Sequence, residues 1–305
     1  MVTAAGLLEK PITYDIIVSD FGRDATIEYL RLVSNSEKRL IKTILDRDGL
    51  EFFDEYRRIM FTAIGDVAFF KEAAILKSAL SHGHLRDDIL IGVGSSPSMS
   101  QEFIDRVTLS VIQEALVAID HGHNILRVMI PCNTLSSLAK QIGKMIHSDM
   151  ELKRIVETYA PSGFDIHRLT TAHIDVYTVP EAVMRHLAET KKNGKMTHLL
   201  VLGTSGTNAI YGAYTESYAI IVLPIENWEQ ELIDEAIVAS IGGDRNKIDI
   251  HKEQLQKEII KPRSDMFENL TILEACTDFR LGLGVSSLEV FADVMVMDCY
   301  RTLIS

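Results

Sequence analysis

Two cysteines stand where a short apolar run gives way to small hydrogen-bonding residues. Cys132 precedes Asn133 and Thr134, and Cys276 precedes Thr277 in the same way. A free thiol has a pKa of about 8.5, and the amides at the start of a helix that follows a strand stabilise its thiolate. A single cysteine after a strand is more often a buried structural residue, but two such turns in the two halves of one chain favour a function. We therefore interpret Cys132 and Cys276 as the candidate catalytic residues.

The third cysteine, Cys299, lies between Asp298 and Tyr300 and has no such turn, so we interpret it as a structural residue. Three cysteines in 305 residues are too few for a disulfide scaffold, and the odd number favours a reducing compartment. We therefore expect a cytoplasmic protein.

The composition argues against several other classes of protein. Apolar residues make up 47% of the chain and charged residues 24%, which predicts a large core and little disorder. The formal net charge of −12 argues against a surface for nucleic acid or an anionic membrane. No apolar run approaches the roughly 20 residues that span a bilayer, and the first residues lack the basic and apolar regions of a signal peptide. We expect a soluble, acidic protein.

Short runs of Val, Ile and Leu recur along the chain and predict strands that are buried on both faces. The predicted strands cover residues 14–19, 89–93, 126–130, 174–177, 198–202, 219–223, 270–273 and 294–297. Apolar residues with helical spacing predict helices over residues 24–33, 100–119, 180–187 and 230–240. Strands that alternate with helices predict parallel βαβ units with right-handed crossovers.

Two segments interrupt this alternation. Residues 35–86 are charged and mostly helical in pattern, and residues 148–170 form a mixed segment. We interpret both as insertions or long helical connections on an α/β frame. The polar residues 191–195 end one predicted helix just before a strand, and we expect a domain boundary near residues 175–195.

Taken in order along the chain, the motifs resemble those of the aspartate/glutamate racemase superfamily, and its aspartate racemase branch in particular. The family motifs Cys-Asn-Thr and Gly-Cys-Thr-Glu correspond to Cys132-Asn-Thr and Ala275-Cys-Thr-Asp. The family's first turn, Gly-Gly-Met-Gly-Pro-Glu-Ala-Thr, corresponds to residues 19–26, and its Leu-Gly-Thr-x-x-Thr turn corresponds to residues 202–207. A final Asp-Thr segment is echoed by residues 297–299.

The resemblance implies a fold of two pseudo-symmetric α/β domains, each with a small parallel sheet flanked by helices and with the active site in the cleft between them. The domains would cover residues 1–178, with the helical insertion at about 35–86, and residues 179–305. Each domain would carry one of the two candidate cysteines. Family members commonly form dimers, so we expect a homodimer that binds neither nucleic acid nor membranes.

The resemblance also implies a reaction without cofactor or metal. Cys132 and Cys276 would remove the α-proton of a dicarboxylic amino acid from one face and return a proton to the other. Proton removal builds negative charge on the substrate carboxylate, which amides and hydroxyls must stabilise, and the second carboxylate needs a cation such as Arg245 or Lys247. The expected substrate-binding residues are Phe21, Gly22, Ser95, Asn133, Thr134, Thr204, Thr207, Arg245, Lys247, Thr277 and Asp278.

Several departures from the family pattern support a second hypothesis. Ser19-Asp20 replaces the first Gly-Gly pair, Arg23 replaces the proline, and Asp278 replaces the glutamate. The alternative is a catalytically altered or silent ligand-binding relative. Maleate isomerase and hydantoin racemase are alternatives within the superfamily, whereas arylmalonate decarboxylase keeps one cysteine and is disfavoured by the presence of both.

Overall fold

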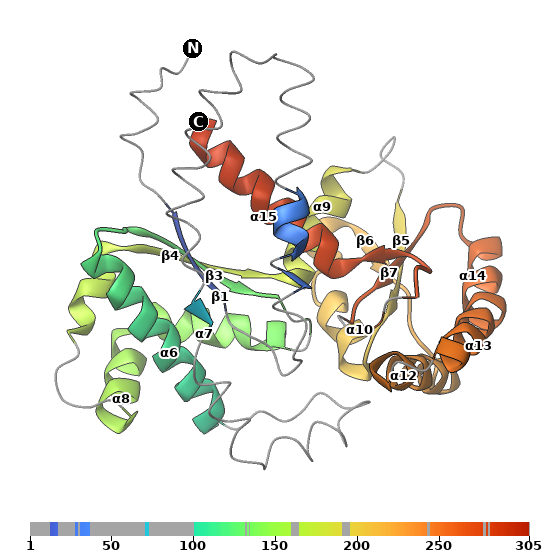
Figure 1. Cartoon of the computed structure of the whole chain (residues 1–305), viewed down its shortest axis with the longest axis horizontal. Coiled ribbons are helices and arrows are strands. Elements are labelled where there is room, and N and C mark those ends of the chain that lie inside the picture. Colours follow the sequence, from blue (N-terminus) through green and yellow to red (C-terminus); the bar gives the residue numbers. More distant parts are fainter. Residues whose placement is uncertain are drawn as a thin grey trace.

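The computed structural model describes residues 13–17, 28–29, 31–36, 71–72, 101–131, 133, 135–159, 165–190, 196–242, 245–276, 279 and 281–304. These residues form an α/β fold with two small parallel sheets flanked by helices (Figure 1). The predicted fold class is confirmed at this level. Within the described residues, no helix combines the length and the apolar character that crossing a membrane requires.

The first sheet has four parallel strands in the order β2-β1-β3-β4. They are β1 (Thr13–Ile17), β2 (Lys71–Glu72), β3 (Ile125–Ile130) and β4 (His173–Thr178). All but the first residue of β3 are buried, as expected for a central strand that is covered on both faces. The strands predicted over residues 126–130 and 174–177 are confirmed, and the one predicted over 14–19 is confirmed at its described residues 14–17. The strand predicted over 89–93 lies outside the described residues.

Three helices cover one face of this sheet, namely α6 (Gln101–Asp120), α7 (Ala139–Ile146) and α8 (Asp149–Tyr159). Alternate residues of β3, including Leu126 and Val128, belong to one buried cluster with Ile112 of α6 and Ile142 of α7. Each such buried side chain stabilises the fold by about 1.5–3 kcal/mol. The helix predicted over residues 100–119 is confirmed.

The two interrupting segments are described to different extents. Within residues 148–170, the described positions include α8 and the 3-10 turn that runs from Ile166 to Thr171 just before β4. Within residues 35–86, only the helical residues 35–36 and strand β2 are described. The helix predicted over residues 24–33 is helical at its described positions, and helical backbone continues to residue 36.

The second sheet also has four parallel strands, in the order β6-β5-β7-β8. They are β5 (Thr197–Leu202), β6 (Ile220–Val222), β7 (Leu270–Glu274) and β8 (Val285–Ser286). In each sheet the first strand along the chain lies between the second and the third, and the fourth is at the edge. The strands predicted over residues 198–202, 219–223 and 270–273 are confirmed.

Different helices cover the two faces of the second sheet. Leu200 and Leu202 pack on one side against α12 (Asn227–Gly242), α13 (Arg245–Leu255) and the π-helical turn Gln256–Ile260, which continues into α14 (Lys261–Met266). Leu199 and Val201 pack on the other side against α9 (Val179–Glu189), α10 (Ser205–Gly212) and α15 (Ser287–Ile304), and the short α11 (Thr215–Tyr218) lies beside them. The helices predicted over residues 180–187 and 230–240 are confirmed.

Helix α15 corrects one prediction, because it contains the residues 294–297 that were predicted to form a strand. The error has a physical cause. Leu288, Phe291 and Met295 recur at helical spacing and are buried, but Val294 and Val296 on other sides of the helix are buried as well. A helix that is covered on several sides has a continuous apolar run, which short-range periodicity does not distinguish from a buried strand.

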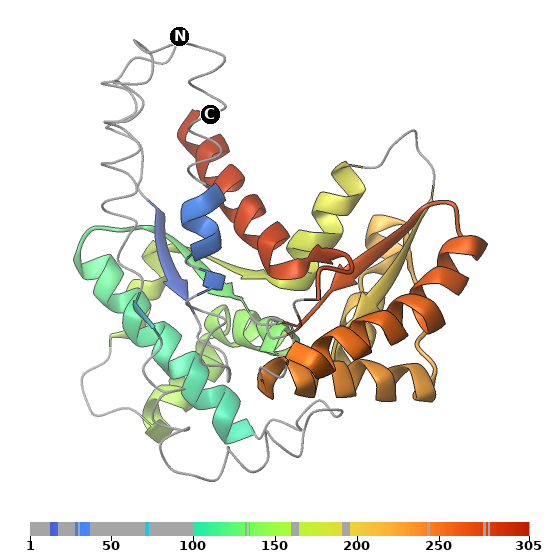
Figure 2. The same ribbon diagram turned by 45° about the vertical axis from the view of Figure 1, so that its right-hand side comes forward.

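An apolar cluster shared by both sheets surrounds α15, and we call it the central cluster. Met129 of β3, Val183 of α9, Val201 of β5 and Phe291 of α15 all belong to it. The ring of Tyr29 lies 5.4 Å from that of Phe291, centroid to centroid. Figure 2 shows α15 running from the second sheet across to the first, beside the helical residues 28–29 and 31–36. The two sheets are therefore joined through a common core.

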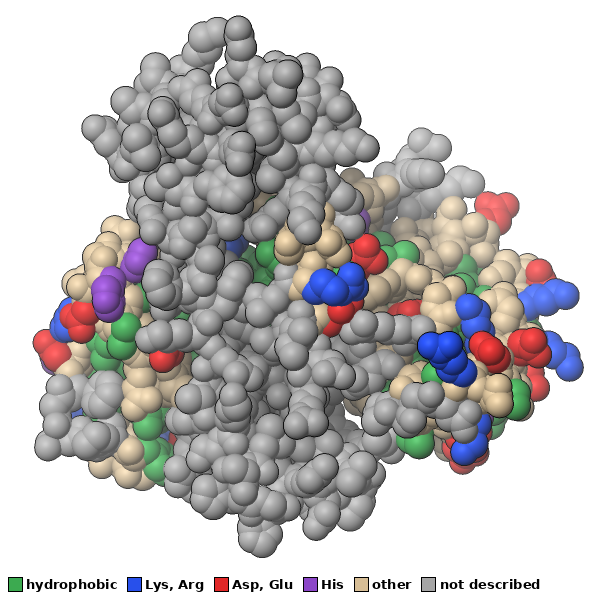
Figure 3. All heavy atoms as spheres, in the orientation of Figure 1, with side chains coloured by type: hydrophobic (Ala, Val, Ile, Leu, Met, Phe, Trp, Pro, Cys, Tyr) green, Lys and Arg blue, Asp and Glu red, His purple; other side chains and the backbone are tan. Residues whose placement is uncertain are grey.

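The described surface over α12, α13 and α14 mixes basic and acidic side chains rather than separating them (Figure 3). Such a mixture of signs does not create a strong field of one sign. Across this face, the net charge of −12 is therefore not concentrated in a single acidic patch.

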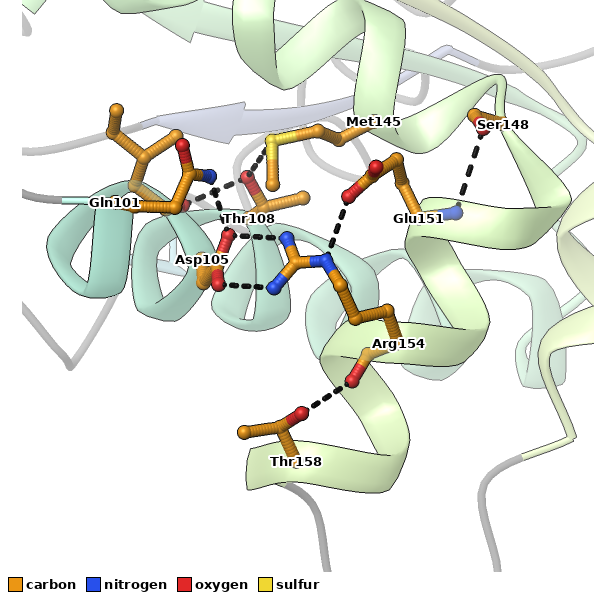
Figure 4. Close-up of polar contacts among 9 residues, drawn as sticks. Gln101, Asp105, Thr108, Met145, Ser148, Glu151, Arg154 and Thr158 are labelled. Atoms are coloured by element: carbon orange, nitrogen blue, oxygen red, sulfur yellow. Dashed lines mark hydrogen bonds and ion pairs between the residues drawn. The ribbon is translucent and has the colours of Figure 1, made fainter.

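A charged network ties α6 to α8 (Figure 4). Arg154 donates from Nη1 to Asp105 Oδ2 at 2.6 Å and from Nη2 to Asp105 Oδ1 at 2.7 Å, which makes a bidentate pair. Its Nε donates to Glu151 at 2.8 Å, and Gln101 donates to Asp105 at the same distance. The Asp105 side chain is buried, and the hydrogen bonds from Arg154 are the main cause of its lowered pKa.

This network predicts a pH-dependent loss of stability when Arg154 is replaced. Arg154→Met leaves a buried carboxylate without its cation, and we expect the free energy of unfolding at neutral pH to fall by about 2 kcal/mol, after allowance for solvent screening of the exposed part of the guanidinium. Because the pKa of Asp105 is lowered in the folded state, its contribution exists above the unfolded pKa of about 3.9 and disappears as the pH falls below it. Urea unfolding at neutral and acidic pH measures both effects.

Arg168→Met is the matched control. Arg168 pairs with Asp120 on the surface, where both side chains are exposed. We expect no measurable change in the free energy of unfolding for this variant. An equal loss in both variants, or a deficit of Arg154→Met that persists at acidic pH, would contradict the assignment.

Candidate functional site

The carboxyl ends of β5 and β7 lie side by side and carry the described candidate residues. Ala275 N–H donates to Leu202 C=O at 2.8 Å, which extends the pairing of the two strands to their ends. Gly203 and Cys276 follow directly. A Cβ at Gly203 would lie 3.1 Å from the Thr207 side chain and 3.2 Å from the Ala275 carbonyl oxygen, so a larger residue would require its neighbours to shift by a few tenths of an ångström. In parallel sheets, ligands bind at this end of the strands.

Cys276 is half-buried at the end of β7. It packs against the apolar cluster formed by α12, α13 and the second sheet. Phe279 N–H donates to its carbonyl oxygen at 3.1 Å, which closes a turn directly after the cysteine. The other predicted catalytic residue, Cys132, lies outside the described residues.

Glu274, the last residue of β7, binds the loop that follows Cys276. Its buried carboxylate accepts a hydrogen bond from Leu283 N–H at 2.6 Å. Gly282 has a φ of 65°, and a Cβ at Gly284 would lie 2.3 Å from the Ile272 carbonyl oxygen, so both positions favour glycine. Burial raises the pKa of Glu274, and hydrogen bonds from main-chain amides of this loop oppose the shift. We call Glu274 and these amides the loop clasp.

Thr204 and Thr207 form the turn between β5 and α10. Their hydroxyl oxygens lie 2.9 Å apart, and Thr207 N–H donates to the Thr204 carbonyl oxygen at 2.8 Å. Gln230 of α12 fixes the same turn by donating to the Gly203 carbonyl oxygen at 3.0 Å. The two hydroxyls carry two hydrogens and use one for the bond between them, so the pair can donate one hydrogen bond to an anion. Their role as substrate-binding residues stays a prediction.

Asn133 links the end of the first sheet to two helices of the second half. Its Oδ1 accepts a hydrogen bond from the Tyr211 hydroxyl of α10 at 2.8 Å. Its Nδ2 donates to Ser287 Oγ, at the first residue of α15, at 3.1 Å. All three side chains are buried, and burial raises the pKa of Tyr211. The structure therefore gives Asn133 two protein partners where the sequence predicted a substrate contact.

The remaining predicted residues are either on the surface or outside the described residues. Arg245 and Lys247 lie in the first turn of α13, and both side chains are exposed. The predicted residues outside the described ranges are Phe21, Gly22, Ser95, Thr134, Thr277 and Asp278. In the part of the chain that is described, no group of three or more His, Cys, Asp or Glu side chains is arranged to hold a metal ion.

A hollow of about 210 Å³ lies elsewhere, at the end of β4 and the start of α9. Its charged residues are Asp175, Glu181 and Arg185, and Arg185 is already paired with Asp298 at 2.5 Å. Burial raises the pKa of the adjacent Tyr177. The remaining charges are negative, so this hollow does not suit an anionic substrate.

Sequence reasoning missed Tyr211, Ser287, Gln230 and Glu274. Glu274 had a visible signal, because a carboxylate at the end of an apolar strand needs a partner when it is buried. Tyr211 and Ser287 had none, because their partner Asn133 is 78 and 154 residues away along the chain.

The loop clasp predicts a distinctive response to Glu274→Gln. The pKa of Glu274 is raised in the folded state, so its contribution to stability is present below the unfolded pKa of about 4.3 and is lost as the pH rises through the folded pKa. Glutamine keeps an oxygen that can accept from Leu283 N–H but does not ionise. We expect the free energy of unfolding of Glu274→Gln, relative to wild type, to increase as the pH rises from acidic to mildly alkaline. Urea unfolding across this range measures the difference.

Glu274→Ala is the control, because it removes the acceptor. We expect it to lower the free energy of unfolding by about 1–3 kcal/mol across the same range, since the Leu283 amide loses its partner. A wild type that gains stability over Glu274→Gln with rising pH would show that the ionised carboxylate is the favoured form.

Comparison with known proteins adds no relative to these observations. The chain matches no protein-family model and no curated protein. The resemblance to aspartate and glutamate racemases therefore rests on the sequence motifs. Of the residues in these motifs, the structure describes the contacts of Asn133, Thr204, Thr207 and Cys276.

Proposed function

We propose that the chain is a cofactor-independent amino-acid racemase of the aspartate/glutamate type, with Cys132 and Cys276 as its acid–base pair. One observation carries the proposal. Asn133, the residue that follows Cys132, is hydrogen-bonded to α10, and α10 follows the Gly203 turn beside Cys276. This contact supports a common site for the two cysteine turns, which lie more than a hundred residues apart along the chain.

The strand orders support the proposed pseudo-symmetry. Both sheets place their first strand between the second and the third, with the fourth at the edge. One candidate cysteine follows the third strand of the first sheet, and the other follows the third strand of the second. Two domains, residues 1–178 and 179–305, with a shared site between them would place one thiol on each side of a small substrate.

In the proposed reaction, the α-carbon of the substrate loses one proton to one cysteine and gains one proton from the other. The thiolate of one cysteine takes the α-proton, and the electron pair of the broken C–H bond delocalises into the substrate carboxylate. The thiol of the other cysteine then donates its proton to the opposite face of the α-carbon. The pair ends with its protonation reversed, so the next turnover starts from the other enantiomer.

The described residues supply donors for the negative charge that develops. The hydroxyl pair of Thr204 and Thr207 has one hydrogen to donate, and the amides at the start of α10 point out of the same turn. A dicarboxylic amino acid is the proposed substrate, with Arg245 or Lys247 as the proposed partner of its second carboxylate. We propose that the active form is a homodimer in the cytoplasm.

Proton exchange in deuterated water tests this function. The wild-type protein is incubated with L-aspartate and L-glutamate, and α-deuteration and the two enantiomers are measured. We expect deuteration together with racemisation, and we expect Cys132→Ala or Cys276→Ala to slow racemisation by about 100- to 10,000-fold because each removes an acid–base group. Each single variant can still exchange the α-proton of the one enantiomer that faces its remaining thiol.

Cys299→Ala is the matched control, because this thiol is assigned no role and its loss should leave the rate unchanged. Racemisation at the wild-type rate by Cys132→Ala would rule out the two-cysteine mechanism. Binding of aspartate or glutamate by the wild type without any α-deuteration would instead identify the silent ligand-binding relative.

A further inference from the structure

The Asn133 side chain is the meeting point of three segments that are far apart in sequence. It follows β3, its oxygen accepts from Tyr211 of α10, and its nitrogen donates to Ser287 of α15. The exposed fractions are 4% for Asn133, 0% for Tyr211 and 1% for Ser287. Water therefore cannot replace either hydrogen bond without a rearrangement of the packing around it.

We propose that Tyr211 and Ser287 are positioning residues that hold Asn133, the residue after Cys132, at a fixed place relative to the Cys276 side of the site, and we call the side chains of Asn133, Tyr211 and Ser287 the amide clamp. The role of the clamp in proton transfer rests on the proposed function. Neither residue belongs to the sequence motifs of the resemblance. Both act through Asn133 and not on the substrate.

The clamp holds the Asn133 amide from two sides. Its oxygen accepts from the Tyr211 hydroxyl and its nitrogen donates to Ser287 Oγ, so both ends of the amide are bonded to helices of the second half. The rings and helices behind the clamp are also fixed, because Tyr211 belongs to the central cluster with Val201 and Phe291. A displacement of Asn133 would therefore break its hydrogen bond to Tyr211, because the packed Tyr211 ring cannot move with it.

The clamp reaches Cys276 through a short and rigid path. Tyr211 lies on α10, which begins after Gly203 and Thr204. Gly203 follows Leu202, whose carbonyl oxygen accepts from Ala275 N–H, and Cys276 is the next residue. Proton transfer between each thiol and the α-carbon depends steeply on the placement of the two thiols, since an error of about 1 Å can slow a reaction about 100-fold.

Tyr211→Phe is the central variant, because it removes one oxygen and keeps the ring that packs in the central cluster. The α-deuteration experiment gives its kcat and KM. We expect kcat to fall by about tenfold or more while KM changes by less than about twofold, because a positioning residue acts on the reaction step. Tyr218→Phe is the control, since it removes a phenol oxygen from a half-buried tyrosine that packs beside the central cluster and does not contact Asn133 in the clamp, and it should leave both constants unchanged.

A second readout does not require activity. The rate of alkylation of each cysteine by iodoacetamide is followed by peptide mass spectrometry across a range of pH around the ordinary thiol pKa of about 8.5. We expect Tyr211→Phe to shift the pH profile of Cys132 and to leave that of Cys276 unchanged. Ser287→Ala breaks the other end of the clamp and should shift the Cys132 profile in the same way, so the test remains if Tyr211→Phe fails to fold.

The two readouts separate the inference from the proposed function. A wild type without α-deuteration rules out the racemase, whereas the alkylation profiles still decide whether the clamp controls the Cys132 turn. Variants that only lower the midpoint of thermal unfolding, with an unchanged Cys132 profile, would overturn the clamp and leave a structural hydrogen bond. An unchanged kcat in a folded Tyr211→Phe protein would overturn the proposed role of the clamp in proton transfer.

Discussion

The position of α15 between the two sheets is the constraint on which the rest of the structure depends. Phe291 and Met295 share the central cluster with Met129 of the first sheet and Val201 of the second. Arg127 of the first sheet is buried, and its Nη1 also donates to the Met295 carbonyl oxygen at 3.3 Å. Separating the sheets would expose this apolar surface and leave a buried guanidinium without that acceptor. Met129 and Val201 each lie one residue before the end of their strand, so this packing sets the distance between the strand ends of the two sheets.

Polar pairing then specifies the strand ends more finely than apolar packing does. The Asn133 amide, the Thr204 and Thr207 hydroxyls and the Glu274 carboxylate are each bonded to a particular partner. A buried polar group that loses its partner carries the full cost of its desolvation, so few alternative arrangements compete with the observed one. Packing brings the two halves of the chain together, and the Asn133 bonds join the end of β3 to α10 and α15.

The sequence predicted the parts of the structure that depend on local pattern. Strands such as β3 and β5 were found because both of their faces are buried and their apolar runs are continuous. The same reasoning failed for residues 294–297, because α15 is buried on several sides and has the same kind of run. The turn at Gly203 and Thr207 was found from its motif. The clamp of Asn133, Tyr211 and Ser287 could not be found, because no spacing rule relates residues that meet only after both sheets have formed.

The proposed reaction also depends on the charges near the site. The protein is acidic, yet the proposed substrate carries two carboxylates. Within the described residues, Arg154, Arg185 and Arg263 are already engaged by Asp105, Asp298 and Glu229 at 2.5–2.6 Å. An anion at the β5–α10 turn would therefore meet main-chain amides and the threonine hydroxyls in place of these arginines. Fixed dipoles of this kind act only over a short distance, so they can favour a carboxylate locally whatever the net charge of the protein.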